Sequence, residues 1–514
     1  MICLLGYQRS HEEYLAWLRP RLQDLLTTSP FLAYEYENVL CKALILNLDA
    51  ARPLLAPCYS KDQGRPVEFL PVEMFRTTIL MVGLRITSPT EWAIKLSRNP
   101  LLALLSGFEP NRTPSAAVIY DFWDRLYLQD KQLRIQEKKR LRKKRKKPKN
   151  TKKGEKLPNR NPGVCHRLLQ SYRKGGFRSS KRPERLLQLL FTKVFVDQSI
   201  AQGILPSDMH IAGDGSPFET ASNSYGKRTC SCWEQDIYRC ECPRRYGDPY
   251  ANWGWDSSRN VYFYGRNLYT LTCVNGLYEL PVFLRCGQAS RNDGPLSMFS
   301  IHEAATLFHS IHARMDLWIA DSAHDVLAIY SLLDDLHILP VIDLNKRKPL
   351  NSPISLTEDG TPLCPGHQPM VYWGYEKARG RMKWRCPRKA GSKARRAAVT
   401  CNQACGQCSP YGKSTYIQLA WDKRAFPVIP RGTELWTTYY NQRTSSERIN
   451  KRYNDYGLDT TRVKGNHAWL YIATLAAMNM HLDAWIWLRL DMQQTDRQTL
   501  IAQYLHPIVE HEAA

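Results

Sequence analysis

The sequence predicts an α/β protein in which a helical N-terminal region precedes a core of alternating strands and helices. Apolar residues recur at helical spacing up to residue 128, whereas short β-branched and aromatic runs alternate with helical patterns from residue 186. A stretch rich in cysteine and basic residues then interrupts the core. We therefore expect a helical domain (1–128), a basic linker (129–185), the first part of the core (186–345), a cysteine-rich basic insertion (346–435), the second part of the core (436–490) and a C-terminal tail (491–514).

The N-terminal helices have recognisable starts. The apolar run 72–86 has helical spacing, Ser88-Pro89-Thr90-Glu91 has the form of a capping box with proline at the first helical position, and Thr113-Pro114 repeats this pattern. Asn99-Pro100 is expected to end the middle helix. Short helices with brief connections suit a helix-turn-helix-like DNA-binding domain, and they suit any small helical bundle equally well.

The positive charge is concentrated in one place. The net charge is +24, and residues 131–160 contribute +14 of it through sixteen Lys/Arg against Glu137 and Glu155. Such a charge favours a polyanionic partner, either nucleic acid or an anionic membrane surface. Residues 138–149 hold ten basic side chains in twelve, and we expect them, with Lys143, Lys144 and Arg145 at the centre, to contact the DNA backbone. The alternative is a solvated linker.

Nothing in the sequence resembles an export signal or a membrane span. Residues 1–5 are apolar but too few, and the apolar run 468–490 is interrupted by Asn479, His481 and Asp483, which favours a buried helix. We expect a cytoplasmic protein associated with the nucleoid and no membrane partner. The fifteen cysteines are then expected to be reduced thiols or metal ligands. Nucleotide-binding glycine motifs and serine-hydrolase motifs are absent from the sequence.

Three carboxylates stand where a metal-dependent active site would need them. Asp214 follows the predicted strand 209–213, Asp321 follows the strand 317–320, and Glu447 lies on a helix that begins near Thr444. Mg²⁺ prefers carboxylate oxygens, and two-metal phosphodiester cleavage needs several that converge. Singly, each has an ordinary explanation: Asp214-Gly215 as a turn, Asp321 as a helix N-cap, and Glu447 as part of a capping box or an ion pair. Together, in this element order, they favour a metal site.

These segments resemble the catalytic core of Asp-Asp-Glu insertion-sequence transposases. In that family an Asp lies on the first core strand, a second Asp lies in an Ala-Asp-Ser-containing context on the fourth, and a Glu lies on a later helix. Tyr440, Arg443 and Glu447 match the spacing of the subgroup's Tyr-Arg-Glu-Lys signature, although the position of its Lys is occupied by Asn454. Arg462, Gly465 and the helix 468–490 also resemble the segment that lies after the Glu helix in such proteins. The order of strands and helices agrees with an RNase-H-like core.

The resemblance implies a function and a set of partners. Asp214, Asp321 and Glu447 would bind two Mg²⁺ ions, for which Mn²⁺ can substitute, and Tyr440, Arg443 and Lys451 would hold a DNA phosphate beside them. The substrates would be double-stranded DNA ends carrying terminal inverted repeats and a target DNA, with a homodimer bringing two ends together. Asp325, His324 and Asp343 are further candidates near the site, with His324 expected on a helix face.

Two groups of cysteines are candidate zinc ligands. Cys230, Cys232, Cys240 and Cys242 lie within thirteen residues between the first two core strands, and four thiolates suit tetrahedral Zn²⁺. The second group, with His367 beside it, lies in the insertion and holds too many ligands for one site: Cys364, Cys386, Cys401, Cys405 and Cys408. Reduced thiols in surface loops remain the alternative for both.

Two other functions fit the same residues. A related RNase-H-like nuclease would cut DNA without rejoining it. A zinc-containing DNA-binding regulator derived from a transposase would do neither. Inverted repeats flanking the gene would favour the transposase over both.

Overall fold

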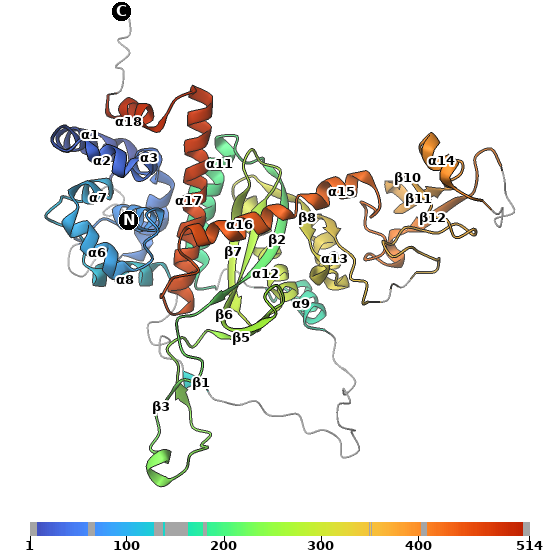
Figure 1. The fold of residues 1–514 in the computed structure, drawn as a ribbon, viewed down its shortest axis with the longest axis horizontal. Coiled ribbons are helices and arrows are strands. Elements are labelled where there is room, and N and C mark those ends of the chain that lie inside the picture. Colours follow the sequence, from blue (N-terminus) through green and yellow to red (C-terminus); the bar gives the residue numbers. More distant parts are fainter. Residues whose placement is uncertain are drawn as a thin grey trace, which may run out of the picture.

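The computed structural model describes residues 8–59, 67–127, 163–177, 182–348, 350, 352–401 and 409–506, together with the backbone of 137 and 138. A helical region, a central mixed sheet and a small three-stranded sheet are arranged in this order along its longest axis (Figure 1). The predicted α/β class is confirmed in this coarse sense, as are the mixed sheet and the cysteine cluster near residue 230.

The central sheet has six strands, and β2 lies in its middle. β2 pairs antiparallel with β6 on one side and parallel with β8 on the other, β9 continues the parallel part, and β5 and β7 both pair antiparallel with β6. β8 is buried along nearly its whole length, as expected of an apolar strand with both faces covered. The strands are β2 (Asp208–Glu219), β5 (Asn252–Asp256), β6 (Val261–Cys273), β7 (Leu280–Gln288), β8 (Arg314–Ala320) and β9 (Leu339–Ile342).

Helices cover both faces of this sheet. Asp214 on β2 accepts a hydrogen bond from Asn450 of α16 (Thr444–Asp455), whereas a Cβ on Gly215 would collide with Asp293 of α12 (Asp293–His309). Because neighbouring residues of a strand point to opposite faces, α12 and α16 cover opposite sides. α13 (Leu327–Asp335) and α9 (Val164–Arg173) pack with α12, and α15 (Glu434–Asn441) packs beside α16 against β8 and β9.

The N-terminal region is helical, as predicted, and proline marks three of its helix starts. α5 begins at Pro71, α6 begins at Pro89 with Ser88 accepting a bond from the Glu91 amide, and α7 begins at Pro100. α8 begins at Ala116, as expected from the Thr113-Pro114 pattern before it, with Ser115 as its N-cap. The helices are α1 (His11–Thr28), α2 (Phe31–Glu35), α3 (Glu37–Ile45), α4 (Arg52–Leu55), α5 (Pro71–Gly83), α6 (Pro89–Arg98), α7 (Pro100–Leu105) and α8 (Ala116–Leu126).

One long helix joins the helical region to the sheet. α17 (Asn466–Gln493) packs against α3 and α5 and also against β7, and all of these contribute to one continuous hydrophobic core. Its polar residues are buried with partners: Asn479 donates to the Ile79 carbonyl, and His481 contacts Ser199. The run 468–490 is therefore a buried helix, as predicted. None of the helices in the described ranges has the length and apolar character needed to cross a membrane.

Three further helical segments complete this body. α18 (Arg497–Leu505) lies within the expected C-terminal tail, and its Leu500, Ile501 and Leu505 are buried beside α1 and α3. α10 (Arg185–Leu190) continues through a π-helical stretch, Phe191–Val196, into α11 (Asp197–Ala201). This segment packs against β7 and α17.

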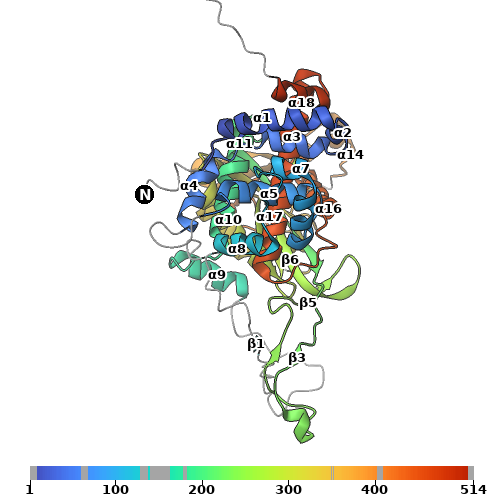
Figure 2. The same cartoon turned by 90° about the vertical axis from the view of Figure 1, so that its left-hand side faces the viewer.

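Two cysteine-bearing segments extend from the sheet. A hairpin of β3 (Lys227–Arg228) and β4 (Arg244–Arg245) projects from the body in both perpendicular views (Figures 1 and 2), and β1 (Glu137–Lys138) pairs with β4. Between β9 and α15 the chain forms a small antiparallel sheet with its own hydrophobic core around Met382 and Trp384. This sheet contains β10 (Val371–Glu376), β11 (Arg381–Arg385) and β12 (Ser414–Gln418), and the short helix α14 (Lys393–Ala398) lies between the last two strands in sequence.

Candidate functional site

Asp214 lies in the middle of the sheet. We expected the strand to end there, but β2 continues to Glu219, so Asp214-Gly215 is strand and not a turn. The glycines on either side of Asp214 leave no room for a larger residue, because a Cβ on Gly213 would collide with the Trp318 ring and one on Gly215 would collide with Asp293. Asp214 points to the other face of the strand, where its half-buried carboxylate lies on the α16 side of the sheet.

Asp321 directly follows β8, the parallel neighbour of β2. The register Ala212↔Ile319 places Asp214 and Asp321 at the same level of the sheet. Asp321 caps the short turn after it by accepting from the Ala323 amide, and its Oδ1 lies 2.7 Å from His324 Nδ1. His324 is fully buried and contacts the Tyr269 hydroxyl through Nε2 at 2.7 Å. His324 thus lies in a short 3-10 helix, Ser322–His324, and its buried ring orients Asp321.

A third carboxylate, Asp293, lies on the α12 side of the sheet, opposite the side on which Asp214 meets Asn450. It lies at the start of α12 and accepts a hydrogen bond from Asn267 at 2.7 Å. Burial, followed by the neighbouring carboxylates of Asp293 and Asp321, raises the pKa of Asp214 to about 6. Burial also raises the pKa of Asp293, whereas for Asp321 the effect of burial is outweighed by His324, which lowers its pKa. The charges of these three carboxyl groups therefore act on one another, although among the described residues their oxygens do not lie within 4.8 Å of one another as a group.

Glu447 lies on the helix that packs over this cluster, but its carboxylate is engaged elsewhere. It accepts a hydrogen bond from Arg443 at 2.7 Å, the ion pair expected from their i,i+4 spacing. One turn further along α16, Asn450 donates to Asp214 at 2.9 Å and fixes the helix over β2. Among the described residues, the carboxylates of Asp214, Asp321 and Glu447 do not come within 4.8 Å of one another as a group.

The three residues predicted to bind phosphate, Tyr440, Arg443 and Lys451, lie on α15 and α16 or between these helices. Tyr440 on α15 stacks on Trp436 with a centroid distance of 4.5 Å, and Arg443 lies 6.0 Å from the Tyr440 ring. The charges of Glu447 and Asp214 both raise the pKa of Arg443, against burial, so this guanidinium lies between Glu447 and the sheet carboxylates. Lys451 is exposed on α16, one turn after Glu447.

Asp325 is a structural residue and not a metal ligand. It is fully buried and accepts from both Nε and Nη2 of Arg424, at 3.1 and 2.7 Å, and from the Tyr330 hydroxyl. Asp343 accepts from the Leu344 amide just beyond β9, and its charge contributes to raising the pKa of Tyr440.

Replacing Arg424 by Met should destabilise the fold by about 3–5 kcal/mol, because the buried Asp325 carboxylate would lose its charged partner. Arg314→Met is the matched control, since Arg314 forms an exposed ion pair with Asp208 that should contribute at most about 1 kcal/mol. Denaturant unfolding measures both. Equal stabilities of the two variants would contradict a structural role for the Asp325–Arg424 pair.

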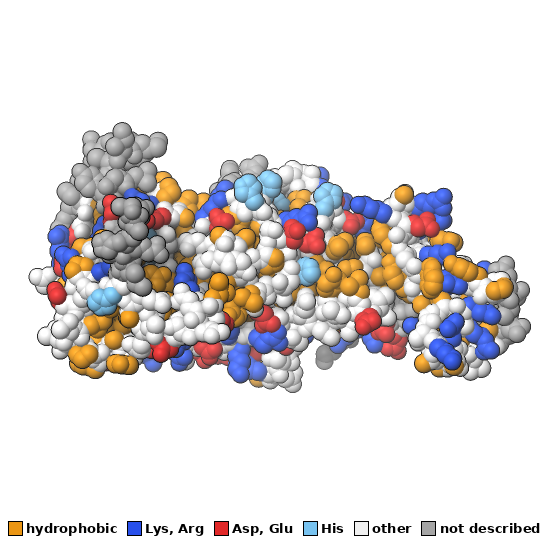
Figure 3. Space-filling view, turned by 90° about the horizontal axis from the view of Figure 1, so that it is seen from above, with side chains coloured by type: hydrophobic (Ala, Val, Ile, Leu, Met, Phe, Trp, Pro, Cys, Tyr) orange, Lys and Arg blue, Asp and Glu red, His pale blue; other side chains and the backbone are white. Residues whose placement is uncertain are grey.

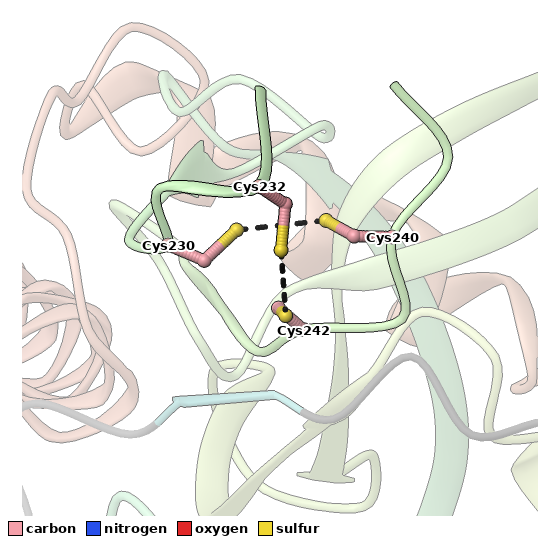
Figure 4. Close-up of side chains that lie close together, drawn as sticks. All are labelled: Cys230, Cys232, Cys240 and Cys242. Carbon is pink, nitrogen blue, oxygen red and sulfur yellow. Dashed lines mark hydrogen bonds between the residues drawn. The ribbon is translucent and has the colours of Figure 1, made fainter. Parts of the chain in front are cut away.

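The four cysteines of the hairpin form a metal-ligand cluster. Cys230 and Cys240 have their sulfurs 3.5 Å apart, as do Cys232 and Cys242, and all four sulfurs lie within 4.8 Å of one another (Figure 4). Zinc–sulfur bonds of about 2.3 Å in a tetrahedron require sulfurs roughly 3.8 Å apart, so the arrangement fits Zn²⁺. The hairpin tip lacks a core of its own, because its large apolar residues, Trp233, Ile237 and Tyr238, are exposed. A metal could therefore supply the interactions that fold it.

The second group of cysteines forms no such cluster among the residues that the structure describes. Cys364, Cys386 and Cys401 do not come together as a ligand group, and Cys364 packs against the small core of the β10–β12 sheet. Cys405 and Cys408 lie outside the described residues, as do Lys143, Lys144 and Arg145 of the basic run. The roles expected of these residues therefore stay predictions.

No family model and no curated protein matches this chain. The candidate site is consequently defined by its geometry. Three of its residues, Asp293, Asn450 and Asn267, were missed in the sequence. Asn292-Asp293-Gly294-Pro295 has the composition of an ordinary helix start, and neither asparagine belongs to a recognisable motif.

Proposed function

We propose that this chain is an Asp-Asp-Glu transposase that cuts and rejoins DNA strands at the ends of its own element. The observation that carries this proposal is the placement of Asp214 and Asp321 side by side on adjacent parallel strands, under the helix that carries Glu447. The order of elements along the chain, with three strands followed by strand–helix–strand and a later helix, agrees with the expected RNase-H-like core and supports the proposal.

Binding of divalent cations by these carboxylates would require a rearrangement, because among the described residues no three of their ligand oxygens lie within 4.8 Å of one another. Burial, followed by the charges of Asp293 and Asp321, raises the pKa of Asp214 to about 6, and a bound cation would offset both effects. Asp214 and Asp321 would hold Mg²⁺, and Glu447 would join them after exchanging its contact with Arg443. When bound, two Mg²⁺ ions activate the attacking water or DNA 3′-hydroxyl and stabilise the leaving oxygen.

The contacts of the surrounding side chains indicate their roles. His324 holds the Asp321 carboxylate in one orientation, and Asn450 does the same for Asp214. Arg443, once released from Glu447, presents a guanidinium that can pair with two oxygens of one phosphate. Tyr440 and Lys451 lie on either side of this position along α15 and α16.

The direct test uses linear DNA ending in the inverted repeats that flank the gene. Cleavage and joining in Mg²⁺ support the transposase, cleavage alone supports the nuclease, and binding without cleavage supports the regulator. Detection of each product on denaturing gels separates the three.

Replacing the basic residues of 138–149 by Gln should weaken binding to every DNA sequence. These residues hold ten positive charges, and each phosphate that they neutralise releases counterions, so the salt dependence of binding should become shallower by about 0.9 per lost contact. Anisotropy titrations over a range of KCl concentrations measure this slope. A slope identical to that of the unmodified protein would show that the run does not contact phosphate.

A further inference from the structure

The small sheet between β9 and α15 presents aromatic rings and cationic side chains in alternation. The Arg385 guanidinium lies 4.1 Å from the Trp373 ring centre and 3.5 Å from that of Tyr411. Lys383 lies 5.3 Å from Tyr411 and 5.8 Å from Tyr416, and Arg381 lies 4.1 Å from Tyr416. We call this set the ladder face: Trp373, Arg381, Lys383, Arg385, Tyr411 and Tyr416.

The strand register explains why these side chains share one face. Along β11, Arg381 and Lys383 are half-buried and alternate with the buried Met382 and Trp384, whereas Arg385 is only 6% exposed and donates to the Tyr411 carbonyl. Lys383 pairs directly with Tyr416 of β12, and the opposite face of the sheet packs on the small core. The ladder face is thus the solvent side of a sheet whose other side supplies its stability.

The rings of the ladder face are not core residues. Trp373, Tyr411 and Tyr416 are 48%, 49% and 39% exposed, whereas Trp384 on the other face is 3% exposed. Each exposed ring lacks the stabilising free energy of about 1.5–3 kcal/mol that burial of a large apolar side chain would provide. Cation–π contacts at exposed sites return about 0.5–1 kcal/mol each, so they do not by themselves account for the arrangement.

The charge around this face indicates a polyanion. Residues 371–418 hold eleven Lys/Arg against Glu376 alone, a net charge of +10, and Glu376 is already bonded to Arg381. Together with the +14 of residues 131–160, this accounts for the whole net charge of +24. In the space-filling view, Lys and Arg gather among apolar side chains at the end of the molecule formed by this sheet (Figure 3).

We propose that the ladder face binds a single DNA strand, with successive bases stacked on Trp373, Tyr411 and Tyr416 and with phosphates paired to Arg381 and Lys383, while the buried Arg385 supports the rings of Trp373 and Tyr411. A duplex would offer its phosphates but not its base faces, which are already stacked, so exposed rings favour an unpaired strand. The choice of DNA over RNA rests on the proposed function. The preference for a single strand rests on the face itself and requires no cleavage activity.

The test measures binding of a labelled oligothymidylate of about 16 nucleotides to the full chain in EDTA, so that no cleavage can occur. Trp373→Ala and Tyr416→Ala should each weaken binding about tenfold, since a base–aromatic stack is worth roughly 1–3 kcal/mol. Tyr416→Phe keeps the ring and should bind normally. Tyr34→Ala removes a similarly exposed tyrosine from α2 and is the matched control.

Salt separates this face from the basic run 138–149. Stacking of a base on a ring releases no counterions. The ratio of the dissociation constants of native protein and Trp373→Ala should therefore stay the same as KCl is raised, while the contribution of the basic run 138–149 to affinity declines. A duplex of the same sequence should bind native and variant protein equally. Alanine variants that stay folded and bind the oligothymidylate as tightly as native protein would overturn the proposal. It would also be overturned if the variants lost duplex binding as much as single-strand binding, or if native protein bound the corresponding RNA more tightly than the DNA.

A second measurement uses the unmodified protein and so does not depend on the variants folding. Photocrosslinking with an oligonucleotide that carries 5-bromodeoxyuridine should label peptides containing Trp373, Tyr411 or Tyr416. Crosslinks confined to other peptides would contradict the proposal. Failure of strand cleavage in Mg²⁺ alongside positive crosslinks would overturn the proposed function but leave this binding face intact.

Discussion

Asp321→Asn should abolish Mg²⁺-dependent strand cleavage and leave DNA binding nearly unchanged. The substitution keeps the shape of the side chain and an oxygen for the Ala323 amide, but it removes the negative charge beside Asp214. Loss of a carboxylate that holds a catalytic cation forfeits several kcal/mol of transition-state stabilisation, which corresponds to a rate reduced by about a thousandfold or more. Single-turnover cleavage of the element's end DNA measures the rate, and anisotropy measures the binding.

The matched control for this experiment is Asp316→Asn. Asp316 lies on the same strand, and its side chain makes only a long ion pair of 4.0 Å with Arg314. Its cleavage rate should equal that of the native protein. Full cleavage by Asp321→Asn would remove Asp321 from the active site, and an equal loss in both variants would point to damage to β8 instead of loss of a metal ligand.

Removing two ligands of the hairpin cluster, with Cys232→Ser and Cys242→Ser together, should eliminate one bound zinc per chain. Zinc contributes on the order of 10–16 kcal/mol to the folding of small thiolate sites, whereas the hairpin tip exposes Trp233, Ile237 and Tyr238 and has no core to replace it. The tip should therefore become sensitive to proteases. The body should remain folded, because its core does not include these residues.

Elemental analysis of purified protein and limited proteolysis measure the two effects. Cys58→Ser is the control, since Cys58 is a half-buried thiol outside the cluster, and its zinc content should be unchanged. Fewer than one zinc per native chain, or the same content in the double variant, would show that Cys230, Cys232, Cys240 and Cys242 are reduced thiols.

The sequence pattern located the strand before Asp321, because a strand that is buried on both faces appears as a nearly continuous apolar run. It also located the helix that carries Glu447, and α16 begins at the expected Thr444. The predicted end of β2 was wrong, because Asp214-Gly215 has the composition of a turn, whereas pairing with β6 keeps the strand extended to Glu219.

The contacts that the sequence did not predict join side chains that are distant in sequence. The contact of His324 with Tyr269 joins residues fifty-five positions apart, and the pairing of Asp325 with Arg424 joins residues ninety-nine positions apart. No local pattern contains this information. The Cys230–Cys242 cluster could be predicted because its four ligands are close in sequence, whereas the grouping of Cys364, Cys386 and Cys401 depends on how the insertion folds.

The central claim is that the carboxylates around Asp214 form a cation site for DNA strand cleavage and joining. The most direct measurement incubates the native protein with DNA that carries the element's own inverted repeats, together with a target plasmid, in Mg²⁺, in Mn²⁺ and in EDTA. We predict cleavage at the repeat ends and joined products in either cation, and neither in EDTA. Absence of cleavage in both cations by protein that binds these ends, or cleavage that persists in EDTA, would contradict the claim.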